Sequence, residues 1–402
     1  MDIKIKRKKN VLLILPRGIF PCVGGYEKKN KKLIEILSKH YNLTAVVISN
    51  ARISGEEKLF LTANTAAFHY IAIPRFRFIL NAFRALFSRE PVQVGYFYFN
   101  KAQKIIDGLL PGQDIAIGAL VRTMKYLQNA PAGCKIVFDM VDSIGLNYKN
   151  SQKNTASYFW RLMYKIEAPR LLDYEKYWVK RAAATFLFNK EEYEYCRAYG
   201  NARLLPHGVD ERLLSYDIID KKYSSSTAFI GKMNYQPNID AVKWYVKNVH
   251  SKMEPKIPFI IAGAFPTADV LKLAENDPSI TITGFVDDPF VIIKSAMAVV
   301  APMQTGAGIQ NKVLEAMALG ALNIITPLAA KPIIGARDGE EFLIAATARD
   351  FCSKIKDISA NPGKYAAIKP AAREFIAKNY TWQAYEEIYI NAIEGGPANA
   401  KH

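Results

Sequence analysis

The sequence lacks the features that mark several classes of protein. Its four cysteines are scattered and form no C-x-x-C pair, which argues against a disulfide framework or a zinc site and fits a reducing compartment. No apolar run approaches the ~18 residues that a membrane-spanning helix needs. The basic start MDIKIKRKKN is followed only by the short apolar run VLLIL, without a small-residue cleavage site, so we predict no signal peptide. These absences favour a cytoplasmic protein.

Acidic residues are outnumbered by basic ones. The net charge is +17, and residues 1–40 contain eleven Lys and Arg against three Asp and Glu. Such a surplus predicts attraction to an anionic partner: a nucleic acid, an anionic lipid surface or a phosphorylated substrate. The alternative is a solvated basic surface that only aids solubility.

Short apolar runs alternate with helical patterns through most of the 402 residues, half of which are hydrophobic. Strands that alternate with helices predict parallel sheets covered on both faces. Two such series predict two doubly wound α/β domains with a break near residues 204–214, followed by a pair of helices over residues 371–394. The predicted strands are residues 11–15, 43–49, 68–73, 94–99, 114–119, 135–139 and 185–188, then 227–231, 259–263, 280–284, 297–301, 322–326 and 342–346.

The segment TGAGIQNKVLEAMALG, residues 305–320, follows one of these strands and predicts a loop that leads into a helix. Ligands of open parallel sheets gather beyond the carboxyl ends of the strands. Glycines let the backbone approach a ligand, and the free N–H groups at a helix N-terminus suit a phosphate. Lys312 adds a charge in the first turn, and Glu315 could accept hydrogen bonds from a ribose diol. Together these groups describe a nucleotide site.

The same residues also fit an ordinary strand–helix turn, in which Lys312 and Glu315 form a surface ion pair. Two glycines alone are weak evidence, because the segment matches neither GxxxxGK[ST] nor GxGxxG. In both interpretations Gly320 is expected to cap the C-terminus of the helix.

Extended to TGAGIQNKVLEAMALGALNIIT, the segment resembles the donor-binding segment of retaining GT-B glycosyltransferases of family 4, in the branch used for bacterial surface-polysaccharide assembly. Further segments agree in order from residue 11 to about residue 390. RGIFPCVGGYEKKNKKLIEIL resembles the N-terminal glycine loop and first helix, and FDMVDS a segment near the acceptor. PHGVD resembles the domain crossover, FIGKMNYQPNIDAVKWY the start of the C-terminal domain, and GFVDDPFVIIKSAMAVVAPM the stretch before the donor motif.

The resemblance implies a GT-B fold, in which two doubly wound Rossmann-like domains face each other across a cleft. Residues 1–206 would bind the acceptor, residues 207–375 would bind the donor, and residues 376–402 would form a helix that returns to the first domain. The implied activity is metal-independent transfer of a hexose from a nucleotide sugar to a glycan or lipid-linked acceptor. The nucleotide sugar is then a substrate and no cofactor is required, with a UDP-sugar favoured over a GDP-sugar.

The resemblance also implies roles for individual residues. Lys232 would replace the family's phosphate-binding arginine, and with Lys312 would stabilise the leaving diphosphate. Glu315 would bind the ribose, and Asp139 or Asp142 would lie near the acceptor hydroxyl. We expect Asp142, Lys232, Lys312 and Glu315 to be catalytic. The donor-binding residues would be Gly24, Gly25, Lys232, Gly284, Phe285, Val286, Thr305, Gly306, Ala307, Gly308, Ile309, Lys312 and Glu315.

Several positions depart from the family's pattern. Many members place an acidic residue just before the glycines, where this chain has Gln304 and Thr305. The identity of the transferred sugar is therefore not predicted. No clear match exists for the usual histidine near the acceptor, and His207 replaces an asparagine in PHGVD. For Asp142, capping of the helix that begins in SIGLN is the alternative role. No D-x-D motif is present, and Asp287–Asp288 precedes a proline as in a turn, so we predict no essential metal.

The segment PRFRFILNAFRALFSREP, residues 74–91, combines a wide apolar face with cationic residues, as in helices that lie on anionic bilayers. It predicts a peripheral protein on the cytoplasmic membrane face, docked near a lipid-linked acceptor. The alternative is a buried helix with arginines at its rim. The docking residues would be Arg75, Arg77, Phe78, Phe83 and Arg84.

Three other functions are compatible with parts of the sequence. A GT-B nucleotide-sugar 2-epimerase would share the nucleotide site but needs acid/base carboxylates and histidines, and only five histidines are present. A nucleic-acid-binding protein would fit the charge, but no recognition helix or aromatic RNA platform is found, so we expect no nucleic-acid partner. A membrane-associated scaffold with an inactive donor site would fit the departures at Lys232 and Gln304–Thr305.

Overall fold

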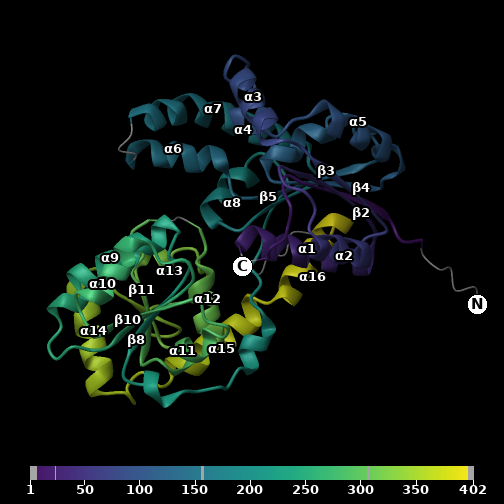
Figure 1. The fold of residues 1–402 in the computed structure, drawn as a ribbon. Coiled ribbons are helices and arrows are strands. Elements are labelled where there is room, and N and C mark those ends of the chain that lie inside the picture. Colours follow the sequence, from purple (N-terminus) through teal and green to yellow (C-terminus); the bar gives the residue numbers. More distant parts are fainter. Residues whose placement is uncertain (1–6, 23, 155–157, 306–307, 397–402) are drawn as a thin grey trace, which may run out of the picture. The chain divides into compact units, whose positions relative to one another are not determined.

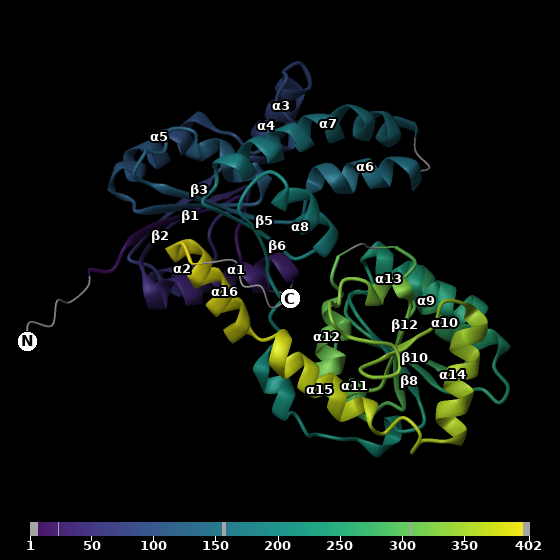
Figure 2. The same cartoon turned by 180° about the vertical axis from the view of Figure 1, so that it is seen from behind.

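The computed structural model describes residues 7–22, 24–154, 158–305 and 308–396. These belong to two compact units: unit 1 covers Met1–Leu205 and Tyr389–Ala398, and unit 2 covers Pro206–Ile388. Each unit is a parallel sheet with helices on both faces (Figures 1 and 2). The prediction of two doubly wound domains is therefore confirmed, and the observed break lies one residue before the expected one.

Unit 1 has a sheet of seven parallel strands in the order β3-β2-β1-β4-β5-β6-β7. Its strands are β1 (Asn10–Leu15), β2 (Asn42–Ser49), β3 (Ala67–Ala72), β4 (Ile115–Ala119), β5 (Lys135–Val141), β6 (Ala184–Leu187) and β7 (Ala202–Leu204). Its helices are α1 (Gly25–His40), α2 (Gly55–Asn64), α3 (Arg75–Leu86), α4 (Val92–Tyr96), α5 (Asn100–Leu109), α6 (Ile144–Asn154), α7 (Tyr158–Arg181) and α8 (Lys190–Arg197).

The strands of unit 1 are buried on both faces, which explains their continuous apolar runs. All five residues from Val11 to Leu15 are fully buried. Leu33, Ile34 and Leu37 of α1 pack inward at helical spacing. Figures 1 and 2 show α1 and α2 on one face of this sheet, and α4, α5 and α7 on the other.

The predicted strand at residues 94–99 is wrong. Residues Val92–Tyr96 form α4, and the aromatic run after it covers α3 instead of joining the sheet. Phe78 of α3 lies with its ring centroid 4.7 Å from that of Phe99 and 5.1 Å from that of Tyr96. The glycine at position 95 permits this packing, because a Cβ there would lie 2.6 Å from the Cβ of Ala85.

Unit 2 has a sheet of six parallel strands in the order β10-β9-β8-β11-β12-β13. Its strands are β8 (Thr227–Ile230), β9 (Phe259–Ala262), β10 (Ile280–Gly284), β11 (Ala298–Ala301), β12 (Asn323–Ile325) and β13 (Leu343–Ile344). Its helices are α9 (Gln236–Asn248), α10 (Ala268–Glu275), α11 (Phe290–Ser295), α12 (Asn311–Ala318), α13 (Pro327–Ala330), α14 (Ala348–Ala360) and α15 (Ile368–Asn379), and α16 (Trp382–Glu394) begins here.

Both sheets reverse their strand order at an inner pair, β1 and β4 in unit 1 and β8 and β11 in unit 2. In open parallel sheets ligands bind beyond the carboxyl ends of the strands at such a switch point. In unit 2 the loops after β8 and β11 therefore lie side by side, and these loops contain Lys232 and the start of the 305–320 segment.

The two predicted C-terminal helices are present, but they divide differently from the expected boundary. Ile376 of α15 and Tyr380 are buried in the core of unit 2. Only the end of α16 packs in unit 1, where the ring of Tyr389 stacks on Phe186 at 4.1 Å and Glu394 accepts a 2.9 Å hydrogen bond from the hydroxyl of Tyr41. No helix in the described residues is long and apolar enough to span a bilayer.

Candidate functional site

The 305–320 segment leads from the end of β11 into α12. The helix begins at Asn311, somewhat later than the glycines suggested, so Lys312 lies in the first turn and Glu315 one turn on, as expected. Gly306 and Ala307 lie outside the described residues. Thr305 and Gly308 are exposed, and a Cβ at position 308 would meet no atom, while Ile309 packs against the core. Crowding by the protein itself therefore does not explain a glycine at 308.

The far end of α12 is fixed by its core face and its cap. Val313, Leu314 and Met317 are fully buried. Gly320 has a φ of 66°, its N–H donates to the carbonyl of Met317, and the next N–H donates to the carbonyl of residue 316. This Schellman arrangement confirms the predicted C-cap and holds the helix, and thus Lys312, in a fixed orientation.

The ammonium group of Lys312 is largely enclosed by unit 2. It donates to the side-chain oxygen of Asn238, lies 3.6 Å from the sulfur of Met303, and stands 4.7 Å from the ring centroid of Phe229. Removal from water lowers its pKa to about 8, against a smaller opposing effect of Glu315. The ammonium therefore lies largely out of water, where an anionic ligand would stabilise its charge.

Asn238 was not singled out from the sequence, although it is the residue that joins two predicted site residues. It lies on the buried side of α9, and its amide nitrogen donates a 2.9 Å hydrogen bond to the carbonyl oxygen of Lys232. Its amide oxygen accepts from Lys312. A single side chain thus fixes the loop after β8 against the first turn of α12. The only available signal was a polar residue on an otherwise apolar helix face.

The other predicted donor residues of unit 2 that the structure describes occupy the same edge of its sheet. Glu315 is half-buried on α12 and interacts with Lys312. Gly284 ends β10 with a φ of 67°, a left-handed conformation that favours glycine. Phe285 beside it is 75% exposed, whereas Val286 packs on the core. A large apolar ring held in solvent next to a glycine turn suits stacking on a flat ligand.

Metal-ligating side chains do not gather in this region. Across the described part of the chain, no group of three or more His, Cys, Asp or Glu residues is placed to hold a metal ion. Asp288 instead accepts a 2.6 Å hydrogen bond from the hydroxyl of Tyr216 and a bond from the N–H of Phe290, so it fixes the turn before α11.

In unit 1, Gly24 and Gly25 lie at the start of α1. Gly24 is the N-cap and has extended backbone angles, and α1 has no side-chain cap. The loop before it is bound to α2, where Glu57 accepts a 2.7 Å hydrogen bond from the N–H of Ile19. The first turn of α1 is not open, because a Cβ at Gly24 would lie 2.2 Å from a carboxylate oxygen of Glu27. Glu27 is also 3.8 Å from Arg17, so the binding role of the two glycines stays a prediction.

Asp139 is not at a surface where it could meet an acceptor. It is fully buried in β5, and its carboxylate forms an ion pair with Lys29 of α1, which is itself 3% exposed. Burial lowers the pKa of Lys29, an effect that Asp139 opposes. The expectation for Asp139 is corrected, because a buried ion pair that joins a helix to the sheet is a structural contact.

Asp142 lies at the carboxyl end of β5 and is exposed. The N–H of Asp142 donates to the carbonyl of Met140 across Val141, whose φ is 68°. This γ-turn is strained for a β-branched residue and directs the chain out of the sheet. The helix cap is Ser143, whose hydroxyl accepts from the N–H of Leu146, so capping by Asp142 itself is excluded.

Two buried glutamates support this turn. Glu192 accepts a 2.9 Å hydrogen bond from the N–H of Ser143, and Glu175 accepts a 2.6 Å bond from the Ser143 hydroxyl and one from the N–H of Gly145. Burial raises the pKa of Glu175 to about 7, and burial together with the charge of Asp142 raises the pKa of Glu192 to about 8.

The predicted membrane helix α3 is neither wholly buried nor wholly exposed. Phe78 is only 2% exposed and packs in the core, so its assignment to membrane docking is corrected. Arg75, Arg77 and Arg84 are exposed, and Phe83 is 62% exposed. The alternative of a buried helix does not hold for this face, which also exposes Phe76, Ile79, Leu80, Leu86 and Phe87.

Residues 225–361 match the family model described as glycosyl transferases group 1. The matched segment contains Lys232, Asn238, Gly284, Lys312 and Glu315. The match supports a glycosyl transfer function. No curated protein sequence matches the chain.

Solved structures with the same fold span nearly the whole chain. Sucrose-phosphate synthase from Thermosynechococcus elongatus has a TM-score of 0.66 at 14% identity, covering 97% of this chain and 100% of that one. Anabaena HepE in complex with UDP has a TM-score of 0.65 at 12% identity, covering 96% and 99%. TarM, which another structure assigns to S. aureus, has a TM-score of 0.64 at 11% identity, covering 96% and 98%. The fold is that of GT-B glycosyltransferases.

Proposed function

We propose that this protein is a retaining glycosyltransferase that moves a sugar from a nucleoside-diphosphate donor to a hydroxyl group of a glycan or lipid-linked acceptor. The observation that carries the proposal is the Lys232–Asn238–Lys312 arrangement after β8 and β11, inside the segment that matches the family model. We further propose a place in bacterial surface-polysaccharide synthesis, on the resemblance of the donor segment.

The donor would be held by unit 2. The diphosphate is assigned to Lys232, Lys312 and the N-terminal turn of α12, and the ribose hydroxyls to Glu315. The base is assigned to the exposed ring of Phe285 beside Gly284. A UDP-sugar is favoured, because the HepE structures contain UDP and UDP-glucose and one TarM structure contains UDP.

The reaction would break the bond between the anomeric carbon and the diphosphate oxygen, whose electron pair stays on the diphosphate. The acceptor oxygen forms the new bond on the same face of the sugar, so the configuration is retained, and its proton passes to the departing phosphate. The sugar becomes oxocarbenium-like as the bond loosens. Lys232 and Lys312 stabilise the growing negative charge, which is the task a metal ion would otherwise perform. We therefore propose metal-independent catalysis.

In unit 1 we assign an acceptor-side role to Asp142. It is an exposed carboxylate whose backbone turn is fixed by Ser143, Glu175 and Glu192. We also propose that α3 docks unit 1 on the cytoplasmic face of an anionic membrane, since its exposed side combines arginines with large apolar side chains.

The proposal is tested by a thermal-shift panel of UDP, GDP, ADP, CMP and their common sugar conjugates. A ligand at 100 times its dissociation constant adds ~2.7 kcal/mol of stability, so one nucleotide should raise the melting temperature clearly. Glu315→Ala should remove the shift. Glu275→Ala, which changes an exposed glutamate of α10, is the matched control and should retain it. If no nucleotide shifts the wild type, the donor site is not functional.

Transfer itself is measured with the nucleotide sugar that binds. Release of UDP should require an acceptor with a free hydroxyl, and proton NMR of the product should show the anomeric configuration of the donor. Inversion of the configuration would contradict the proposed mechanism. Activity that is unchanged by a chelator is expected, and activity lost with the chelator and restored by a divalent cation would contradict metal independence.

A further inference from the structure

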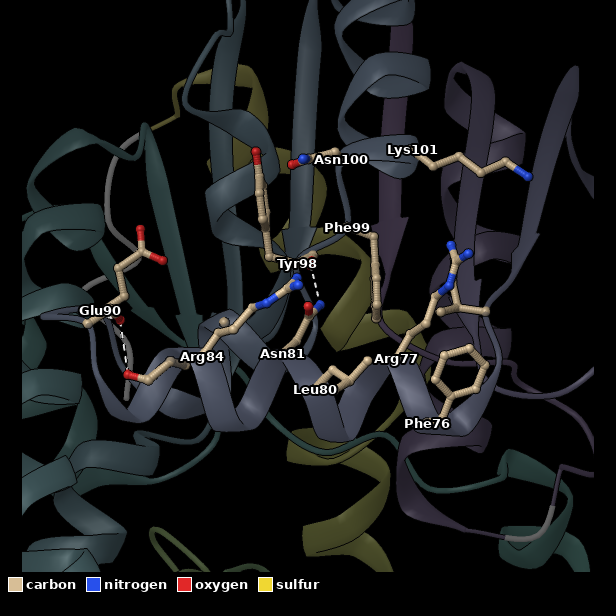
Figure 3. Close-up of a pocket in the computed structure, with 14 residues that line it drawn as sticks. Phe76, Arg77, Leu80, Asn81, Arg84, Glu90, Tyr98, Phe99, Asn100 and Lys101 are labelled. Atoms are coloured by element: carbon tan, nitrogen blue, oxygen red, sulfur yellow. Dashed lines mark hydrogen bonds between the residues drawn. The ribbon is translucent and has the colours of Figure 1, made fainter.

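A pocket lies along the side of α3 that faces the start of α5, within unit 1 (Figure 3). Its volume is about 520 Å³. The floor is formed by Tyr98 and Phe99, and Asn81 fixes this segment through a 2.6 Å hydrogen bond to the carbonyl of Tyr98. The pocket is thus built by two elements that are bonded to each other, so its shape does not depend on the position of unit 2.

The pocket is cationic. Arg77 and Arg84 lie two turns apart on α3, and Figure 3 shows both side chains extending from the helix toward the segment Tyr98–Lys101. Lys101 contributes a third positive charge from the first turn of α5. Among the described residues, none of these three forms an ion pair. The acidic residue of the lining is Glu90, whose carboxylate is bonded at 2.6 Å to Lys125.

The mouth of the pocket is bordered by exposed apolar side chains. Phe76 and Leu80 line it and are 58% and 50% exposed. Farther around the same helix, Ile79, Phe83 and Phe87 are more exposed still, and the rings of Phe83 and Phe87 contact each other edge to face. Soluble proteins seldom leave such a patch without a partner. The observed chemistry is a cationic hollow with an apolar border.

A second apolar surface of unit 1 lies on the hairpin formed by α6 and α7. Tyr158, Phe159 and Trp160, at the start of α7, are 78%, 63% and 52% exposed. Figures 1 and 2 show α3 and this hairpin on the side of the sheet opposite α1 and α2.

We propose that the α3 pocket binds the phosphate of an anionic glycerophospholipid while the exposed face of α3 lies in the bilayer interface. Guanidinium groups bind phosphate oxygens through paired hydrogen bonds, which suits Arg77 and Arg84. The acyl chains of the same molecule would lie against Phe76, Leu80 and Phe83. A soluble phosphate would leave this apolar border in water, and an acidic protein would not require a hollow. The inference extends the membrane docking proposed above and does not depend on glycosyl transfer.

Two double variants that remove equal charge test the pocket. R77A/R84A removes both pocket arginines, and R75A/R89A removes two exposed arginines of the same segment that do not line it. Binding is measured by co-sedimentation with vesicles of phosphatidylcholine mixed with phosphatidylglycerol. Loss of surface charge alone weakens binding about fivefold per arginine. We expect R75A/R89A to show only this loss. R77A/R84A should bind the vesicles about tenfold more weakly than R75A/R89A, because its charge-assisted hydrogen bonds to phosphate are also lost.

Equal losses in the two variants would overturn the pocket and leave only a charged surface. Failure of the wild type to sediment with these vesicles would overturn the inference altogether. Complete displacement of the protein from the vesicles by inorganic phosphate, added at constant ionic strength, would overturn it as well. All four arginines are exposed, so both variants should fold, which circular dichroism checks. The nucleotide thermal shift is measured on the same samples, so a failed donor site and a failed lipid site are distinguished.

Discussion

The ammonium of Lys312, on α12, donates a hydrogen bond to the amide oxygen of Asn238, on α9. The amide nitrogen of Asn238 donates in turn to the carbonyl of Lys232. The orientation of the amide is therefore set by both neighbours, and the two loops at the switch point of unit 2 are joined through one buried side chain. This link holds a lysine charge at the carboxyl edge of the sheet, where a phosphate would bind.

Replacement of Asn238 by alanine should separate the two loops. We expect Asn238→Ala to lower the free energy of unfolding by about 1–3 kcal/mol, because the Lys232 carbonyl and the Lys312 ammonium both lose a partner. Nucleotide affinity should fall about tenfold as Lys312 loses its fixed position. Urea denaturation and titration calorimetry measure the two effects. Asn234→Ala changes an exposed asparagine of the same loop and is the control; a similar result for both would contradict the role of the link.

Nucleotide binding should depend on pH through Lys312. In the free protein its pKa is lowered to about 8 by removal from water, and an anionic ligand favours the protonated form. The affinity for UDP should therefore fall as the pH rises through 8 and above. Calorimetry across this range measures the effect, with Lys312→Met as the control that should bind weakly at every pH. An affinity that does not change between pH 7 and 9 would contradict the prediction.

Glu192 should make the stability of unit 1 depend on pH. Its folded-state pKa is raised from 4.5 to about 8, first by burial and then by Asp142. The native state thus binds the proton more tightly than the unfolded state. The stabilising contribution of Glu192 to the folded state is therefore fully present below about pH 4.5 and is lost as the pH rises through 8. Between pH 5 and pH 8, the free energy of unfolding of Glu192→Gln should rise relative to that of the wild type by on the order of 2 kcal/mol. Urea denaturation at each pH measures this gain, and Glu191→Gln, at an exposed neighbour, should show none.

Two phenylalanines of α3 should behave in opposite ways. Phe78 is 2% exposed among the rings of Tyr96, Phe97 and Phe99, so Phe78→Ala should cost about 3–5 kcal/mol of stability. Phe83 is 62% exposed, so Phe83→Ala should change stability by less than about 0.5 kcal/mol and should reduce binding to anionic vesicles. Denaturation and co-sedimentation measure the pair. A stable Phe78→Ala protein with impaired vesicle binding would show that the two roles are reversed.

Much of the donor region could be predicted from the sequence, because its signals are local. The helix over 311–318 follows from the spacing of Val313, Leu314 and Met317, and its end follows from the single glycine at 320. The alternation of apolar runs with helical patterns likewise predicted both parallel sheets. The short strand β7 was missed, since Ala202–Leu204 carries too few residues to show a pattern.

Other features depend on contacts that no local pattern contains. The run at 94–99 has the composition of a strand, but packing against Phe78 makes it a helix and an aromatic cover. Asp139 and Asp142 are three residues apart in one motif, yet the first is buried against Lys29 and the second is exposed beyond a γ-turn. Which acid can meet a ligand was decided by the direction of each side chain at the end of β5.

The sequence by itself determined the two doubly wound domains and the place of Lys312 and Glu315 on one helix, because periodicity and helix geometry act over a few residues. Only the tertiary structure decided that Asn238 joins Lys312 to Lys232, that Phe78 is core while Phe83 is exposed, and that Arg77 and Arg84 face a pocket. Those outcomes arise from the meeting of segments far apart in the chain, where burial and the pairing of polar groups select one arrangement.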